Sequence, residues 1–204
     1  MSAYQREFSR VTQDKENGAR ARKPRADGER NRQRLIEAAK TVFAAKGSSA
    51  SLDEIARTAG VGIGTLYRHF PTRDALISGL YRNETTQMAE AATRLADTHA
   101  PAEALRQWLL LFVDYMATKH GMAEVLNSVT GGIGALYADS ATCILGALQD
   151  LVDRATASGE IRLGLAPIDV LRAIAGVGTV SSEPGWEKSA RQLIDIIMAG
   201  IRVR

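Results

Sequence analysis

The stretch SLDEIARTAGVGIGTLYRHFPT, from Ser51 to Thr72, decides the fold of the first part of the chain. Ser51 and Glu54 form a capping box, in which each side chain accepts a hydrogen bond from the other residue's backbone amide, so a helix starts here. Gly60 suits the left-handed conformation that ends such a helix. After a short glycine-containing link, a second helix is expected from Ile63 until the sequence FPT. Two short helices joined by a tight turn predict a helix-turn-helix.

The three glycines at 60, 62 and 64 also raise a second interpretation, a loop that cradles a phosphate. Nucleotide-binding fingerprints place such glycines between a buried strand and a helix, whereas the preceding segment here is an amphipathic helix. The helix-turn-helix accounts for more residues, because Val61 and Leu66 are spaced to bury against Ile55. That arrangement leaves small and polar residues on the outer side of the second helix.

This outer side has the composition expected of a surface that enters a DNA groove. Small residues at the start of the helix let its backbone approach the bases. Tyr67, His69 and Arg73 at its far end offer hydrogen-bond donors or charge to phosphates, and Ile63 and Arg68 are candidate base readers. The predicted DNA-contacting residues are Arg32, Ser51, Gly62, Ile63, Gly64, Thr65, Tyr67, Arg68, His69 and Arg73.

Charge is unevenly distributed along the chain. Residues 1–75 hold 15 Lys and Arg against 9 Asp and Glu, while residues 76–204 hold 11 against 14. A basic first third on an acidic body indicates an anionic partner for that third. Residues 1–28 contain few large apolar side chains and no periodicity, which predicts a flexible basic arm. The arm is either a solvated tail or a segment that contacts phosphates or the minor groove.

Composition excludes several other classes of protein. The 204 residues are 45% hydrophobic and include one cysteine, Cys143, so no internal disulfide can form. The polar N-terminus and the lack of a long apolar run predict a cytoplasmic protein without a membrane span. No HExxH or GxSxG motif occurs, and His120 with Glu124 lacks a third metal ligand. We therefore expect no enzyme activity, no cofactor and no metal.

The run AAKTVFAAKGSSASLDEIARTAGVGIGTLYRHFPTRDAL, which ends at Leu76, resembles the DNA-binding domain of TetR-family transcriptional regulators. The resemblance covers about residues 34–76 and includes the specific run GxGTLYRHF. It implies that the helix with Ile63 to Arg68 enters the major groove and that Tyr67 and His69 contact phosphates. Two positions depart from the family pattern: Gly62 stands where Ser or Thr is frequent, and Arg73 stands where Lys is frequent.

The remainder of the chain predicts helices almost throughout, with one short extended piece at IRLGL. The expected fold is all-α, with about nine helices in an N-terminal three-helix helix-turn-helix domain and a C-terminal helical bundle. The expected parts are the arm over 1–28, the DNA-binding domain over 29–76, and the effector-binding and dimerisation domain over 77–204. The expected helices after the DNA-binding domain cover about 73–97, 101–119, a short piece to 129, 135–157, 167–180 and 186–201.

The helix over 101–119 is apolar nearly all round, which predicts a place at the centre of the bundle. Its aromatic and thioether side chains are compatible with a solid core and with the wall of an adaptable cavity. By resemblance, an effector binds between the central helices, and we expect a small, largely apolar compound. The predicted ligand-binding residues are Trp108, Phe112, Tyr115, Met116, Met122, Leu126, Tyr137 and Cys143.

The last two helices carry small residues and more apolar surface than one core face requires. Such helices are typical of a two-fold, four-helix interface, although two ordinary core helices would also explain them. The resemblance favours a homodimer. The predicted interface residues are Leu171, Ile174, Gly178, Trp186, Ile194, Ile197, Met198 and Ile201.

Together these features predict a ligand-responsive, sequence-specific transcriptional regulator whose partner is double-stranded DNA with an inverted repeat. The resemblance favours a repressor that a small apolar effector releases from its operator. Two alternatives remain at this point, a DNA-binding dimer without effector control and a small helical enzyme.

Overall fold

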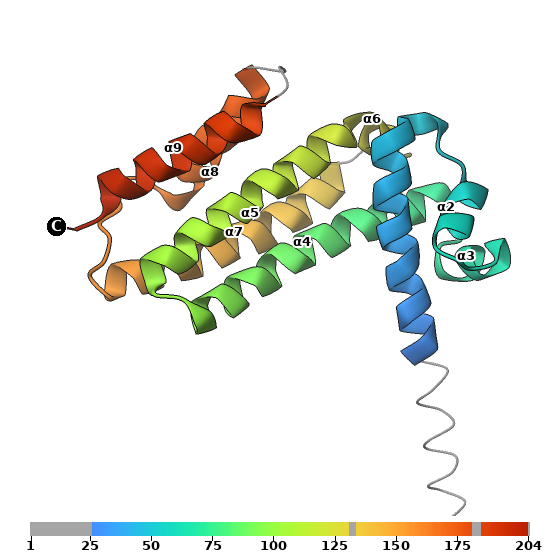
Figure 1. The fold of residues 1–204 in the computed structure, drawn as a ribbon, viewed down its shortest axis with the longest axis horizontal. Helices are drawn as coiled ribbons and strands as arrows, with labels where there is room; N and C mark the ends of the chain where they lie inside the picture. Colours follow the sequence, from blue (N-terminus) through green and yellow to red (C-terminus); the bar gives the residue numbers. More distant parts are fainter. Residues whose placement is uncertain (1–25, 131–133, 181–184, 204) are drawn as a thin grey trace, which may run out of the picture.

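The computed structural model describes residues 26–130, 134–180 and 185–203, which form the all-α architecture that the sequence predicts (Figure 1). The expected extended piece is a single antiparallel bridge between Ile161 and Arg202. The predicted arm lies outside the described residues up to residue 25. The elements are a first helix over 26–46, the 3-10 turn η1 (Gly47–Ser49), α2 (Leu52–Thr58), α3 (Ile63–His69), α4 (Arg73–Thr98), α5 (Pro101–Gly121), α6 (Ala123–Asn127), α7 (Gly134–Ala157), α8 (Pro167–Val180) and α9 (Trp186–Ile201).

Local signals start and end the helices of the N-terminal part. The Ser51 hydroxyl accepts a hydrogen bond from the Glu54 amide at 3.2 Å, and Gly60 has the positive φ of 64° that a left-handed cap requires. Thr72 caps α4 in the same way, accepting from the Ala75 amide at 3.0 Å. Only half of the predicted capping box forms, however, because the Glu54 carboxylate accepts from the Lys46 ammonium at 2.7 Å.

The N-terminal core is built from the first helix, α2, α3 and the start of α4, and it also includes α6. Met122, Val125 and Leu126 are buried in this core although they lie far along the chain. Two polar contacts fasten the same region, Ser48 Oγ to Glu124 Oε1 at 2.6 Å and the Thr130 amide to Asp74 Oδ2 at 3.0 Å. The C-terminal end of α5 is thereby attached to the helix-turn-helix part.

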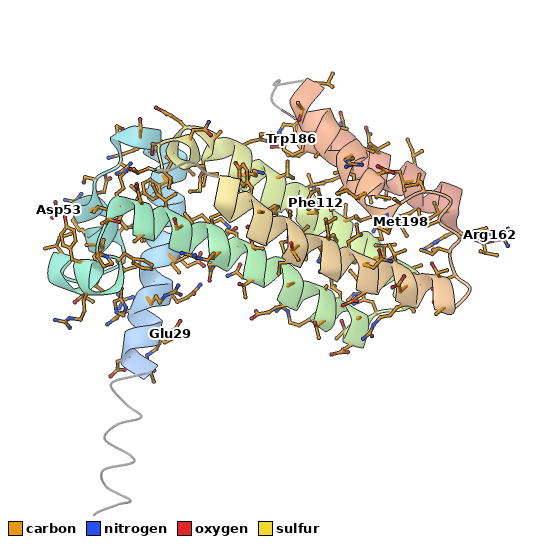
Figure 2. All side chains as sticks on the ribbon, turned by 180° about the vertical axis from the view of Figure 1, so that it is seen from behind. Glu29, Asp53, Phe112, Arg162, Trp186 and Met198 are labelled. Atoms are coloured by element: carbon orange, nitrogen blue, oxygen red, sulfur yellow. The ribbon has the colours of Figure 1, made fainter. Side chains whose placement is uncertain are left out.

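The second core belongs to the bundle of α4, α5 and α7, which run side by side and are covered by α8 and α9 (Figure 1). Phe112 and Met198 lie among these helices, while Arg162 extends away from them (Figure 2). Ionic contacts join α5 to α9, including Arg106 with Asp195 at 2.7 Å. No helix within the described ranges has the length and apolar character that a membrane crossing requires.

Helix α4 connects the two cores. Its 26 residues extend about 39 Å at the usual rise per residue. Its first turns carry Leu76, Ile77 and Leu80 into the N-terminal core, and Met88 and Ala91 belong to the second core. Gly79 allows the ring of Phe70, the residue that follows α3, to pack closely against α4, because a Cβ at this position would lie 2.6 Å from Phe70 Cε1. A displacement of α4 at either end therefore changes the packing of both cores.

Candidate DNA-binding surface and ligand pocket

Helix α3 is anchored by one buried side and exposes the other. Leu66 is fully buried in the N-terminal core, whereas Ile63, Tyr67 and Arg68 are exposed. The space beside Gly62 and Gly64 is open, with no atom within 4 Å of a Cβ built on either residue. The α3 surface is thus smooth at its N-terminal end and bears a phenol and a guanidinium further along, which suits insertion into a groove.

The start of the first helix lies beside the C-terminal end of α3. A Cβ on Gly28 would be 3.9 Å from His69 Cε1, and the Arg32 guanidinium lies 5.5 Å from the centre of the Phe70 ring. Arg32 is also paired with the exposed Glu29 at 3.8 Å. The structure therefore brings Arg32 and His69 to the edge of the α3 surface, while Ser51 lies at the start of α2 as its cap.

Arg73 contacts the backbone of the segment before α2. Its guanidinium donates to the carbonyl oxygens of Ser48, at 3.0 Å, and Ala50, and it lies 4.9 Å from the centre of the Phe43 ring. The planar guanidinium can serve two carbonyls at once, which an ammonium does less well. In this structure Arg73 ties η1 to the start of α4. Its contact with a phosphate stays a prediction, which the salt dependence of DNA binding tests against a purely structural role.

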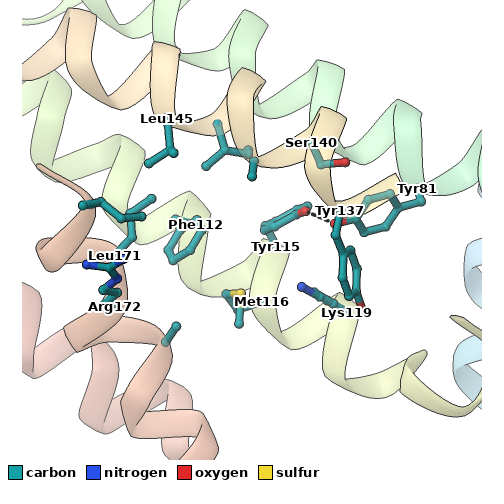
Figure 3. Close-up of a pocket in the computed structure, with 14 residues that line it drawn as sticks. Tyr81, Phe112, Tyr115, Met116, Lys119, Tyr137, Ser140, Leu145, Leu171 and Arg172 are labelled. Carbon is teal, nitrogen blue, oxygen red and sulfur yellow. Dashed lines mark hydrogen bonds between the residues drawn. The ribbon is translucent and has the colours of Figure 1, made fainter. Parts of the chain in front are cut away.

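A cavity of about 290 Å³ lies between α4, α5, α7 and α8 (Figure 3). Its walls are mostly apolar. The volume is at the small end of the range for ligand pockets. The residues that line it are Tyr81, Phe112, Tyr115, Met116, Lys119, Tyr137, Ser140, Ala141, Ile144, Leu145, Ile168, Leu171, Arg172 and Ala175.

Polar groups gather at one end of this cavity. The Tyr115 hydroxyl donates to the Tyr81 hydroxyl at 3.1 Å, and Lys119 Nζ lies 3.8 Å from the centre of the Tyr137 ring. Burial raises the pKa of Tyr115 and Tyr137, so both phenols stay neutral at physiological pH. Burial also lowers the pKa of Lys119. Figure 3 shows Arg172 and Leu171 at the opposite end.

The cavity agrees only in part with the predicted ligand-binding set. Phe112, Tyr115, Met116 and Tyr137 line it, and their contact with a ligand stays a prediction.

The other predicted ligand-binding residues lie elsewhere. Trp108 is fully buried behind Phe112, with ring centres 6.1 Å apart, and its Nε1 donates to the Met88 carbonyl oxygen at 2.9 Å. Met122 and Leu126 belong to the N-terminal core, and Cys143 is exposed. Tyr81 and Lys119 also line the cavity, and the sequence did not predict them as pocket residues. An aromatic residue on one helix and a lysine near the end of another give no sign that they line the same cavity.

Most of the predicted interface residues point into the subunit. Ile174, Ile194 and Met198 are buried in the second core, and Leu171 reaches the cavity. Gly178 is buried against Trp186 and His120, and Ile197 and Ile201 pack partly against the same core. Exposed apolar residues lie away from this core on α8, on α9 and just after α9: Val180 is 90% exposed, Ile196 68% and Val203 50%. We call these three residues, with Ala173, Ala199 and Gly200, the α8–α9 face.

His120 and Glu124 also separate in the structure. The His120 ring meets the edge of Trp186, with ring centres 5.2 Å apart, while the Glu124 carboxylate accepts from Ser48. Among residues 26–130, 134–180 and 185–203, no group of three His, Cys, Asp or Glu is placed to hold a metal ion.

Comparison with known proteins agrees with this arrangement. Residues 35–80 match the family described as bacterial regulatory proteins of the tetR family, and residues 100–203 match the C-terminal domain of SbtR-like transcriptional regulators. The TetR transcriptional regulator SCO0520 of Streptomyces coelicolor is 44% identical, with 84% of this chain and 98% of that chain covered and a TM-score of 0.76. A TetR regulatory protein of Mycobacterium vanbaalenii is 30% identical over 88% and 99%, with a TM-score of 0.73.

A curated relative shares the N-terminal part alone. The regulator SrpR of Pseudomonas putida is 57% identical over 51 residues, which is 24% of each chain. The fold and the exposed α3 surface define a helix-turn-helix DNA-binding transcriptional regulator. The chain belongs to the TetR family, whose members are regulators and not enzymes.

The contrast between Arg68 and Arg73 can be measured. We expect Arg68→Gln to reduce the slope of log affinity against log salt by about one, because the exposed surface of α3 loses one cation and DNA binding then displaces fewer counter-ions. Arg73→Gln should leave that slope unchanged and lower the melting temperature, because two carbonyls lose their donor. Fluorescence anisotropy with a DNA duplex between about 50 and 200 mM salt, with thermal unfolding of both variants, gives the result. An equal loss of slope for Arg73→Gln would restore it to the DNA-contacting set.

Proposed function

We propose that this regulator is a dimeric repressor that binds an inverted-repeat operator and releases it when a small, largely apolar molecule fills the pocket. One observation carries the proposal. Tyr81 on α4 lines the pocket and is also buried in the N-terminal core, so a ligand that displaces its ring acts directly on the helix-turn-helix part. Tyr137 on α7, whose ring centre lies 5.5 Å from that of Tyr81, packs against the same core.

A second route supports the same coupling. Lys119 of the pocket lies near the end of α5, and Met122, which follows that helix, is buried in the N-terminal core. The contacts of Glu124 with Ser48 and of Asp74 with Thr130 hold α6 and its following turn against that core. For ligand control, the free energy of ligand binding must differ by about 1–3 kcal/mol between the arrangement that binds DNA and the arrangement that does not. The free-energy change when a few such contacts rearrange is of the same order.

The α8–α9 face supports the dimer. An exposed side of small and apolar residues on two adjacent helices is the kind of surface that a second copy covers in a four-helix interface. A two-fold protein carries two α3 surfaces related by the same axis, and such a protein reads DNA with two-fold symmetry.

Ile196→Glu should convert the dimer to a monomer, because it places a carboxylate at the most exposed large apolar side chain of α9. Operator affinity should fall with it, since each monomer can hold only one half-site. Analytical ultracentrifugation gives the mass and anisotropy gives the affinity. Leu111→Glu, at an exposed leucine on α5, is the matched control and should remain dimeric. A dimeric Ile196→Glu variant would remove this face as the interface.

The release step is tested with operator selected from genomic fragments and a library of small apolar compounds. Compounds that bind the pocket should raise the melting temperature by mass action and lower operator affinity in the same concentration range. Ala141→Trp, at an exposed position on the pocket wall, should abolish both effects and keep operator affinity. If every compound that stabilised the protein left the operator bound, the chain would be a DNA-binding dimer without effector control.

A further inference from the structure

We infer that the molecule that fills this pocket is an organic anion, with one carboxylate or similar group held by Lys119 and Tyr81 and an apolar body along the rest of the cavity. The inference deepens the proposed function, because it takes the pocket to be the effector site. It specifies the chemistry of the ligand and not only its size and polarity.

The first observation is the isolation of Lys119 from counter-charges. Lys40 and Lys46 each have a carboxylate oxygen 2.7 Å away, from Glu84 and Glu54 respectively. Within the described part of the chain, Lys119 has no carboxylate within 4.0 Å, and its recorded contact is the face of the Tyr137 ring. A half-buried ammonium in apolar surroundings is costly without a counter-ion. An anionic ligand would supply that counter-ion.

The second observation is the hydroxyl pair beside this lysine. Tyr115 donates its single hydroxyl hydrogen to Tyr81, so the hydroxyl hydrogen of Tyr81 is left for a further acceptor. Lys119, Tyr81 and Tyr115 lie at the same end of the cavity in Figure 3. The Lys119 ammonium can only donate, and the Tyr81 hydroxyl, which already accepts from Tyr115, has its hydrogen left to donate. A carboxylate accepts from both groups.

The opposite end of the cavity does not offer a rival anion site. Arg172 lines it, but its Nη1 already donates to Asp169 at 2.8 Å, and its side chain is 71% exposed to water. Between the two ends the walls are formed by Phe112, Ile144 and Leu145. The ligand therefore has one charged end and an apolar body, and a cavity of about 290 Å³ restricts that body to a small ring system or a short chain.

A matched pair of fluorescent probes tests the inference. 8-Anilino-1-naphthalenesulfonate and N-phenyl-1-naphthylamine share one aromatic body, and only the first is an anion. For the wild-type protein we expect the anion to bind about 10- to 100-fold more tightly, the range of one charge-assisted hydrogen bond. Lys119→Met should reduce that preference to about twofold or less and leave the affinity for the neutral probe unchanged.

Three further variants complete the titration. Lys119→Arg should restore the preference for the anion, and Arg172→Met should retain it. Ala141→Trp should remove the signal of both probes. A wild-type protein that binds the two probes equally, fails to bind the anion, or keeps its preference in Lys119→Met overturns the inference. So does a probe signal that Ala141→Trp leaves intact, because the anion then sits outside the pocket.

Operator release is measured separately, so that the two proposals can fail independently. If the anion binds through Lys119 but leaves the operator bound, the assignment of an anionic ligand holds and ligand-controlled release fails. If a neutral compound releases the operator and binds Lys119→Met as tightly as wild type, release holds and the anionic ligand is wrong.

Discussion

Gly64→Glu is expected to lower operator affinity by about 100-fold or more, because it places a carboxylate where the α3 surface would meet phosphates and base edges. The fold should tolerate the change. No atom lies within 4 Å of a Cβ at Gly64, and an acidic residue in the first turn of a helix is favourable. Anisotropy with a DNA duplex, together with thermal unfolding, separates loss of binding from loss of structure.

Gly146→Glu is the matched control, since Gly146 also lies in a helix, on α7, with open space beside it. It should bind DNA as the wild type does. Both variants should unfold at or above the wild-type temperature, because glycine within a helix costs about 1 kcal/mol relative to better helix formers. If Gly64→Glu bound DNA like its control, α3 would not be the element that enters the groove.

Trp108→Ala is expected to lower the free energy of unfolding by about 3–5 kcal/mol. The indole is fully buried at the centre of the second core, stacks on Phe112, and donates to the Met88 carbonyl. Trp108→Phe keeps most of the volume and should lose about 1–3 kcal/mol, because that buried carbonyl loses its donor. Urea denaturation measures the loss of unfolding free energy in both variants. All proteins are compared at one protein concentration, because association of subunits adds to the apparent stability.

Leu111→Ala on the same helix provides the comparison, because Leu111 is exposed, and its cost should stay within about 0.5 kcal/mol. Trp108→Ala could instead keep full stability and lose the response to pocket ligands. That result would make Trp108 part of the pocket wall, as its sequence context suggests. The structure instead gives that role to Phe112 and Tyr115.

The helix-turn-helix could be predicted from the sequence because its determinants are local. The Ser51 and Thr72 caps and the positive φ of Gly60 are each fixed by residues within one turn, and the structure confirms them. Tyr67 and Arg68 are exposed for the same local reason, since Leu66 between them and α2 is the buried residue.

The pocket could be predicted only in part, because it depends on which arcs of several helices face one another. Helix α5 is apolar nearly all round, so its sequence does not indicate which side chains face the core and which reach the cavity. In the structure Trp108 faces the core and Phe112 reaches the cavity. Tyr81 and Lys119 meet there only through the packing of α4 against α5 and α7. Helices α8 and α9 are apolar on two sides, and the sequence does not separate the side buried in the subunit from the side left for a partner.

The burial of α6 in the N-terminal core limits how this protein can be recombined. A fragment of residues 1–80 would lack Met122, Val125 and Leu126, and the apolar surface that they cover would be left bare. A single genetic crossover after the helix-turn-helix therefore cannot graft a foreign DNA-binding domain onto this bundle without a matching α6. New operator specificity is acquired more readily by point substitutions on the open side of α3, which leave that shared core untouched.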